Sequence, residues 1–334
     1  MRELRKDPVV GRWVIISSER ADRPMDFSRR ASAPAGNGCP FCPGHEKETP
    51  PELFVRGRES GESNTEGWAV RVIPNKFPAL QIEGDLDRHG EGMFDKMNGI
   101  GAHEVVIETP DHDARWWDLS ADHLSLIFAA YRERMLDLAH DSRFKYILVF
   151  KNHGEDAGAT LEHPHTQLVA TPIIPKRVRE ELQGARDHYH LKERCVYCDI
   201  IRQELESDTR VVATTDDFVV LQPFAPRFPY ETWVLPRRHA SSFEQGPGEH
   251  LEGLGAVVRD VFRRLHAVLD DPAFNLVLHT APAGDPFLLH FHWHIEIMPK
   301  VTNVAGFEWG SGFYINTIPP EDAARRLRAA IPPA

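Results

Sequence analysis

The run His163-Pro164-His165-Thr166-Gln167 brings together three side chains that can act on phosphorus. If the run is a strand, His163, His165 and Gln167 lie on one face, because alternate residues of a strand point the same way. An imidazole nitrogen attacks phosphorus well when the other ring nitrogen donates to a backbone carbonyl, which fixes the tautomer. We therefore predict that His165 is a covalent nucleophile, that His163 binds metal and that Gln167 donates its amide to a phosphate oxygen.

The four cysteines form two Cys-x-x-Cys pairs, one in each half of the chain. This spacing is the usual one for two thiolates on one zinc ion, which takes four ligands in a tetrahedron. Each half also has a histidine just beyond a predicted strand and a His-x-His run. We predict two structural zinc sites per chain, held by Cys39, Cys42, His112 and His163 and by Cys195, Cys198, His239 and His292. At the second site His290 and His294 compete with His292 as the fourth ligand, because the three alternate along one strand.

A loop at 151–160 joins a predicted buried strand to the His-Pro-His run. It turns through Gly154 and Gly158 and ends at Thr160. A glycine-containing loop of this kind presents backbone amides to phosphate oxygens. Its position directly before the two histidines makes Gly158 and Thr160 candidate substrate contacts.

The elements that must position these residues occur twice, in the same order, after each cysteine pair. Each half has two apolar strands, a helix with apolar residues at helical spacing, a third apolar strand and the His-x-His strand. The predicted elements are strands at 68–74, 104–110, 146–150 and 163–168 with a helix within 124–138, and strands at 218–223, 231–236, 274–278 and 292–297 with a helix within 251–268. We expect an α+β fold of two tandem units, 1–172 and 195–334, each an antiparallel sheet with packed helices. A charged linker at 173–194 joins them, and a short helix containing Leu327 ends the chain.

The overall charge counts against polyanionic partners. The 334 residues include 39 Lys and Arg against 50 Asp and Glu, for a formal charge of -11, so a nucleic-acid surface would have to work against the net field. The apolar stretch Trp13–Ile16 is too short for a membrane span or a signal segment. We expect a cytoplasmic enzyme without nucleic-acid or membrane partners.

Taken together, Cys-x-x-Cys, Pro-Asp-His at 110–112, Asn-x-Gly at 152–154 and His-Pro-His-x-Gln resemble the galactose-1-phosphate uridylyltransferase family. That family is a duplicated, histidine-triad-like branch, and the likeness covers nearly the whole chain. It implies a homodimer, zinc at the first site and a ping-pong reaction in which His165 takes the nucleoside monophosphate of a nucleotide sugar, releases a hexose 1-phosphate and passes the nucleotidyl group to a second sugar phosphate.

The resemblance also implies roles for individual substrate contacts. Asn75 matches a nucleotide contact of the family, and Asn152 and Gln167 match positions beside the phosphate. Glu308, in Gly306-Phe307-Glu308, resembles the residue that holds sugar hydroxyls. These assignments make a UDP-glucose:hexose-1-phosphate uridylyltransferase the first expectation.

Some residues depart from the uridylyltransferase pattern. Ala159 stands where uridylyltransferases have a cysteine, and Thr160 replaces a serine. The segment 306–316 is similar to ADP-glucose phosphorylases, adenylyl-transferring relatives that also keep the second cysteine pair as a zinc site. The alternative expectation is therefore an ADP-glucose phosphorylase-like adenylyltransferase, with ADP-glucose in place of UDP-glucose.

Other functions are weaker candidates. A dinucleoside polyphosphate hydrolase or phosphorylase is one, but Gln167 replaces a titratable group, which favours transfer to an acceptor over hydrolysis. A non-catalytic, zinc-scaffolded binding protein is another, and the acidic balance counts against an RNA-binding form of it. A second active site at His294 is disfavoured, because Glu296 would repel a phosphate where Gln167 would bind one.

Overall fold

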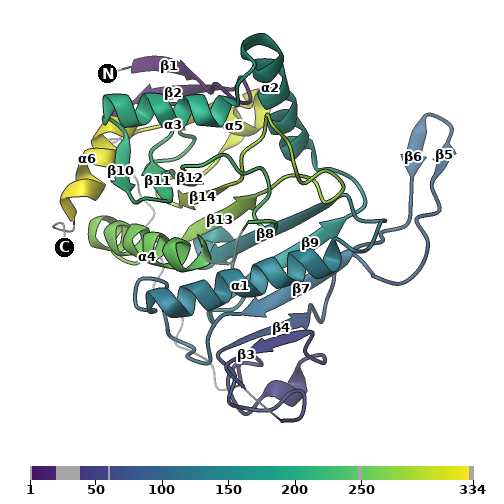
Figure 1. Ribbon diagram of the computed structural model, residues 1–334. Coiled ribbons are helices and arrows are strands. Elements are labelled where there is room, and N and C mark those ends of the chain that lie inside the picture. The colour runs from purple at the N-terminus through teal and green to yellow at the C-terminus, as the bar shows by residue number, and fades with distance from the viewer. Residues whose placement is uncertain (1, 20–37, 59–60, 247–249, 331–334) are drawn as a thin grey trace.

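Ten antiparallel strands form one sheet in the computed structural model, which describes residues 2–19, 38–58, 61–246 and 250–330 (Figure 1). From edge to edge the order is β10 (Val211–Thr214), β11 (Phe218–Leu221), β12 (Thr232–Pro236), β14 (His294–Pro299), β13 (Phe274–His279), β8 (Tyr146–His153), β9 (His165–Thr171), β7 (Ala102–Ile107), β4 (Val70–Pro74) and β3 (Phe54–Arg56). All eight strands predicted from the repeat are present in this sheet.

The strand order confirms the duplication. Read from its outer edge inward, the first unit runs β3, β4, β7, β9, β8 and the second runs β10, β11, β12, β14, β13. The two units join where β8 pairs with β13, with Phe150 opposite Val277. The predicted α+β fold with antiparallel sheets and packed helices is therefore confirmed. The unit boundaries at 172 and 195 stay a prediction.

One face of the sheet is covered by two helices that lie side by side, α1 (Ala121–Leu138) and α4 (His250–Leu269) (Figure 1). They are the two helices predicted from apolar spacing, and Leu124, Phe128 and Phe262 are buried in the core between them and the sheet. Each such side chain contributes about 1.5–3 kcal/mol of hydrophobic stabilisation. The helices cross closely at Gly255, where a Cβ would lie 2.4 Å from the carbonyl oxygen of Ala121.

The opposite face differs between the two units. In the second unit it is covered by α2 (Lys176–Lys192) and α3 (Val196–Ser207), which bury Val178, Leu182 and Ile201. The charged linker predicted between the units thus contains helix α2. In the first unit a small cluster around Phe41 packs on this face, beside His165.

The remaining elements lie outside the duplicated sheet. Near the ends of the chain, β1 and β2 pair antiparallel and β15 adds in parallel to β2, a small sheet that the sequence did not predict. The predicted terminal helix is α6, with Leu327 buried. The bounds are β1 (Arg2–Lys6), β2 (Trp13–Ser17), η2 (Glu46–Glu48), β5 (His89–Glu91), β6 (Phe94–Lys96), η3 (Glu155–Ala157), α5 (Gly306–Ser311), β15 (Tyr314–Asn316) and α6 (Pro320–Ala330).

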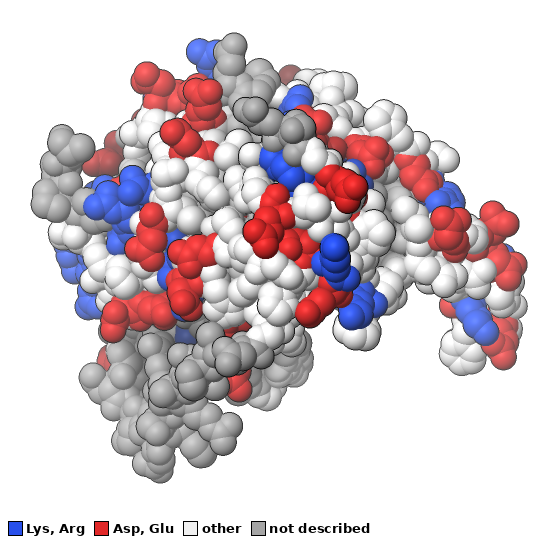
Figure 2. Space-filling view, turned by 90° about the horizontal axis from the view of Figure 1, so that it is seen from below, with Lys and Arg blue, Asp and Glu red and all other residues white. Residues whose placement is uncertain are grey.

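Charged side chains of both signs are spread over the surface of the molecule. On the face seen in Figure 2, acidic and basic side chains are interspersed, and the projecting β5–β6 hairpin carries both signs. Among the described helices, none has both the length and the apolar character needed to cross a bilayer.

Candidate active site and metal centres

His165 begins β9 with its ring oriented through the backbone. Its Nδ1 lies 2.8 Å from the carbonyl oxygen of His163, and because a carbonyl only accepts, Nδ1 carries the proton. Nε2 therefore keeps its lone pair. Burial lowers the pKa of His165, which favours this neutral form. The predicted strand at 163–168 thus starts two residues later, and its first residue has the tautomer that a nucleophile needs.

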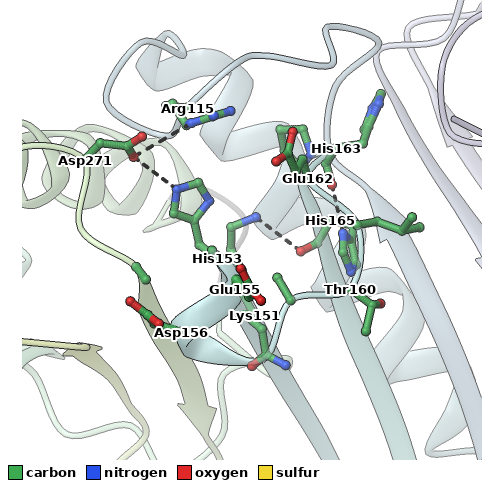
Figure 3. Close-up of a pocket in the computed structure, with 16 residues that line it drawn as sticks. Arg115, Lys151, His153, Glu155, Asp156, Thr160, Glu162, His163, His165 and Asp271 are labelled. Carbon is green, nitrogen blue, oxygen red and sulfur yellow. Dashed lines mark hydrogen bonds and ion pairs between the residues drawn. The ribbon is translucent and has the colours of Figure 1, made fainter. Parts of the chain in front are cut away.

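Two cavities meet at His165, and Thr160 and Leu161 also line both. The larger, of about 480 Å³, is polar and includes Arg115, Asn152 and the loop at 153–156 (Figure 3). The smaller, of about 190 Å³, has an apolar wall and two amide side chains; its lining includes Phe41, Ile73, Asn75, Phe77, Val105 and Gln167. A molecule spanning both cavities would place an apolar ring system on one side of Nε2 and a charged or hydroxylated group on the other.

Gln167 is oriented by His103, a residue that the sequence did not single out. Ala79 N donates to His103 Nδ1 at 3.2 Å, so the proton is on Nε2, which donates to Gln167 Oε1 at 2.8 Å. Asn75 Oδ1 accepts from Phe77 N at 2.9 Å. Its Nδ2, 3.1 Å from the protonated Nε2 of His103, faces another donor and makes no hydrogen bond there. The amide nitrogens of Asn75 and Gln167 both remain donors for a ligand.

The loop before His165 is held by the second unit. Asn275 on β13 donates from Nδ2 to Asn152 Oδ1 at 2.8 Å and to the carbonyl oxygen of Ala157 at 2.9 Å. Gly154 has a φ of 81°, and a Cβ there would lie 2.7 Å from the Cβ of Ala273. The loop therefore packs tightly against the neighbouring unit and keeps Asn152 beside the larger cavity.

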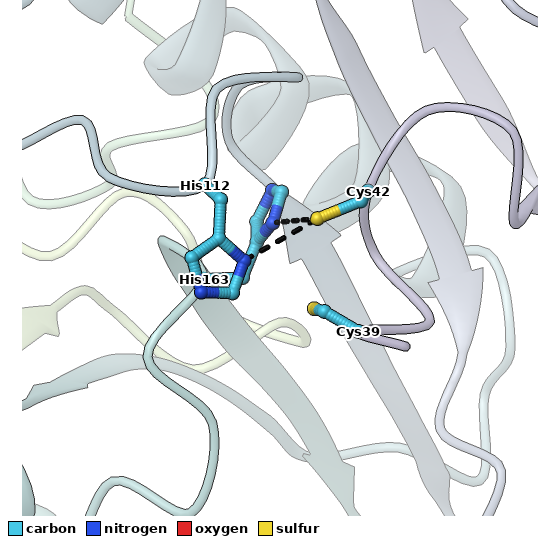
Figure 4. Close-up of side chains that lie close together, drawn as sticks. All are labelled: Cys39, Cys42, His112 and His163. Atoms are coloured by element: carbon cyan, nitrogen blue, oxygen red, sulfur yellow. Dashed lines mark hydrogen bonds between the residues drawn. The ribbon is translucent and has the colours of Figure 1, made fainter. Parts of the chain in front are cut away.

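The four residues predicted for the first metal centre lie close together in the structure (Figure 4). Cys42 Sγ lies 3.3 Å from His112 Nδ1 and 3.6 Å from His163 Nδ1, and the four ligand atoms lie within 4.8 Å of one another. Tetrahedral zinc with ordinary bond lengths separates sulfur and nitrogen ligands by about 3.5 Å, so the cluster fits zinc. His163 Nε2 donates to the carbonyl oxygen of Thr109 at 2.8 Å, and burial lowers the pKa of His163 to about 4. Its ring is thus neutral and fixed, as a metal ligand requires.

The second centre repeats this geometry with Cys195, Cys198, His239 and His292. Cys198 Sγ lies 3.4 Å from His239 Nδ1 and 3.7 Å from His292 Nδ1. The far ring nitrogens donate to the carbonyl oxygens of Leu288 and Pro236, at 3.0 and 2.9 Å. The cluster thus selects His292 over His290 and His294 as the fourth residue, and the two Cys₂His₂ groups could each hold one metal ion.

The position that matches His165 in the second unit is closed. His294 Nδ1 donates to the carbonyl oxygen of His292 at 3.1 Å, as His165 does to His163. The ring of His279 stacks on His294 at a centroid distance of 4.5 Å, and Tyr197 of α3 lies 5.0 Å away. His294 lines neither of the two cavities at His165. The open face of the first unit and the covered face of the second thus give two similar histidines different surroundings.

A buried ion-pair cluster occupies the space next to His294. His279 Nδ1 lies 2.9 Å from Glu181 Oε2, and His279 Nε2 lies 3.3 Å from Glu296 Oε2. Burial disfavours the charged ring, but Glu181 and Glu296 outweigh it and raise the pKa of His279 to about 10. Glu181, His279 and His294 satisfy the spacing of a metal site. Because a protonated imidazole has no lone pair to offer, we interpret the group as an ion-pair cluster.

Two residues expected at the site, Gly158 and Glu308, line neither cavity. Gly158 ends η3 with a φ of 84° and lines neither cavity. Glu308 lies on α5, where its carboxylate accepts from Ala305 N at 3.0 Å, and it too lines neither cavity. Thr160, Asn75, Asn152 and Gln167 do line them.

Several residues at the site had weak signals in the sequence. His103 shares a strand face with Val105, which pairs with Gln167. Asn275 is the polar exception in an apolar strand, a pattern that marks a buried hydrogen bond. Arg115 lies in the irregular segment between β7 and α1, and no pattern placed it near His165.

Comparisons with known proteins identify the family of this chain. The family model described as "Galactose-1-phosphate uridyl transferase, N-terminal domain" matches residues 1–175, and a domain of unknown function, DUF4921, matches residues 114–332. An ADP-glucose phosphorylase of Arabidopsis thaliana is 36% identical over 98% of this chain and 92% of its own length. A galactose-1-phosphate uridylyltransferase of Thermotoga maritima is 30% identical over 98% of both chains.

Solved structures show the same relationship in three dimensions. The crystal structure of an Arabidopsis thaliana ADP-glucose phosphorylase with bound ADP-glucose has a TM-score of 0.85 at 35% identity, covering 98% of this chain and 99% of that one. A uridylyltransferase structure has a TM-score of 0.77 at 28% identity, covering 99% of this chain and 98% of that one. The chain therefore belongs to the galactose-1-phosphate uridylyltransferase family and is a nucleotidyltransferase.

Proposed function

We propose that this protein is an adenylyltransferase of the ADP-glucose phosphorylase type, which moves the adenylyl group of ADP-glucose to inorganic phosphate through His165. The observation that carries the chemistry is the hydrogen bond from His165 Nδ1 to the His163 carbonyl, which directs Nε2 to the junction of an apolar and a polar cavity. The smaller cavity fits a nucleoside, with Phe77, 83% exposed, available to be covered by the base. The larger cavity fits the sugar and the acceptor.

The reaction needs no proton transfer to the leaving group. In the first half, His165 Nε2 forms a bond to the α-phosphorus while the bond to the bridging oxygen breaks, and glucose 1-phosphate leaves as a stable anion. The Nδ1 proton stays on the ring, and its hydrogen bond to the His163 carbonyl stabilises the positive charge that develops on the imidazole. In the second half an oxygen of phosphate attacks the α-phosphorus and the Nε2–phosphorus bond breaks. The amide nitrogens of Gln167 and Asn152 are the side-chain donors that we assign to the phosphate oxygens.

We propose adenine as the nucleotide base, in place of the uracil that the sequence analysis expected first. Uridylyl transfer to a hexose 1-phosphate was expected first, but the plant ADP-glucose phosphorylase is the more similar protein in both identity and TM-score. Ala159 and Thr160 depart from the uridylyltransferase pattern, and the segment 306–316 resembles that of ADP-glucose phosphorylases. UDP-glucose with a hexose 1-phosphate acceptor is the second candidate.

We also propose that both Cys₂His₂ clusters hold zinc and that the protein is a homodimer. The ligand spacing at both clusters supports zinc.

The dimer is supported by Phe307 and Trp309, which are 48% and 78% exposed on either side of Glu308, since an apolar surface of this kind favours burial against a partner. Light scattering after gel filtration tests the dimer, and Glu308→Gln tests the predicted sugar contact through the KM for the nucleotide sugar.

The experiment for the main proposal is intact-mass spectrometry after incubation with ADP-glucose or UDP-glucose alone. An adenylyl adduct should form with ADP-glucose, disappear on addition of phosphate and be absent in His165→Gln. His294→Gln, at the matching position of the second unit, is the control and should keep the adduct. An adduct with UDP-glucose only would support the uridylyl alternative, and no adduct with either would refute covalent transfer.

A further inference from the structure

The sheet splits just beside the nucleophile. The pairing of β8 with β9 ends with Phe150 opposite Gln167, and the same register continued would set Asn152 opposite His165. Instead β8 stays with β13, where Asn152 pairs with Asn275. This split opens the larger cavity, and it takes away the backbone partner that the carbonyl oxygen of His165 would have in a continuing ladder. A buried carbonyl needs another donor.

Lys151 supplies that donor. Its Nζ lies 3.2 Å from the carbonyl oxygen of His165 (Figure 3). It also lies 2.7 Å from Glu108 Oε2. The side chain is only 2% exposed, and its ammonium lies 5.3 Å from the centre of the Trp116 ring. The Lys151 side chain thus reaches from β8 to the backbone of β9, across the gap where the two strands separate.

Glu108 fixes the ammonium in place. Its carboxylate is fully buried and accepts from Trp116 Nε1 at 2.7 Å and from Thr166 Oγ1 at 2.5 Å, besides Lys151. Tyr131 donates to Thr166 Oγ1 at 2.7 Å, so the carboxylate is itself held by neighbours on β9 and α1. These hydrogen bonds hold the Glu108 carboxylate in one position, and the carboxylate in turn fixes the position of the Lys151 ammonium.

We propose that Lys151, held by Glu108, is a positioning residue for nucleotidyl transfer: it clamps the His165 carbonyl where the sheet splits and thereby sets the approach of Nε2 to the α-phosphorus. The inference rests on the proposed role of His165. Lys151 lines the larger cavity, but its ammonium is buried and already bonded to Glu108 and to the His165 carbonyl, so substrate affinity should depend on it little. The covalent step should depend on it strongly, because a displacement near 1 Å at a reacting atom costs about 100-fold in rate.

The test measures single-turnover formation of the adenylyl adduct over a range of ADP-glucose concentrations. Lys151→Met should lower the maximal rate about 10- to 100-fold with less than about a threefold change in the half-saturating concentration. Lys151→Arg, which keeps a cationic donor, should recover part of that rate. Lys151→Met with Glu108→Gln removes both charges, so the double variant should fold without an unpaired buried carboxylate and still transfer slowly.

Arg134→Met is the matched control. Arg134 forms a buried pair with Glu104 of β7, with Nη2 2.8 Å from Glu104 Oε1, and among the described residues its hydrogen bonds go to carboxylates rather than to the backbone of β9. It should lose thermal stability, as Lys151→Met does, and keep the wild-type rate.

The outcomes separate the inference from the proposed function. If the wild type forms an adduct that His165→Gln lacks, the function stands. The positioning role is then overturned if the double variant transfers at the wild-type rate, or if Arg134→Met slows transfer as much as Lys151→Met. If the wild type forms no adduct, the proposed function fails before Lys151 is in question.

Discussion

Alkaline pH should destabilise this protein through one buried imidazole, His279. Two carboxylates, those of Glu181 and Glu296, outweigh burial and raise its pKa from 6.5 to about 10. Because the folded-state pKa is higher than the unfolded one, the stabilisation is fully present below about pH 6.5 and is lost as pH rises toward about 10. Each pKa unit corresponds to about 1.4 kcal/mol, so the charged ring contributes on the order of 5 kcal/mol at neutral and acidic pH.

The assay is urea unfolding of the wild type and of His279→Gln at several pH values from about 6.5 to about 10. The difference in unfolding free energy between the two proteins should shrink by several kcal/mol across this range. The other titrating groups are present in both proteins, so their contributions cancel in the difference. His153→Gln is the control: burial lowers the pKa of His153, so its contribution should not change above about pH 6.5. A wild-type minus His279→Gln difference that stays constant with pH would refute the ion-pair assignment.

Three further predictions concern the metal centres and the site. Wild-type protein should contain two zinc ions per chain by elemental analysis, while Cys42→Ala and Cys198→Ala should each contain one. Both variants should melt at a lower temperature than the wild type. Only Cys42→Ala should also lose adduct formation, because the first metal site holds His163, whose carbonyl orients His165. His103→Ala should slow adduct formation about 10-fold with little change in KM, measured by single-turnover kinetics, because the Gln167 amide loses its anchor. Gly154→Ala should lower the unfolding free energy by about 1–3 kcal/mol in urea titrations, since a positive φ and a close contact both oppose a side chain; an unchanged value would contradict the tight loop packing.

The sequence alone was sufficient for what depends on local pattern and on the repeat. Strand and helix periodicities identified all eight repeated strands and both long helices, because apolar spacing reflects which face is buried. Cys-x-x-Cys spacing together with duplication predicted His112, His163 and His239 among 18 histidines, but left His290 and His294 as alternatives to His292, and the structure groups His292 with the cysteines. Element ends were less accurate: His163 and His292 precede their strands.

Contacts between distant segments could not be read from the sequence. The β2–β15 pairing joins residues near opposite ends of the chain, and Asn275 of the second unit holds the loop of the first. Lys151 gave no pattern and His103 only a weak one, because the role of a single polar residue in a strand depends on what it faces in the folded chain.

The sequence by itself determined that His165 and His294 occupy matching places in two copies of one unit, since the repeat carries both runs. Only the tertiary structure decided which of them meets a substrate-sized cavity. Helices α2 and α3 pack on one unit and bring Glu181 and Tyr197 against the second histidine, while the same face of the first unit stays open around His165. The physical reason is that burial and charge at a residue are set by the segments that fold over it, and here Glu181 comes from α2, a helix that lies between the two repeated units.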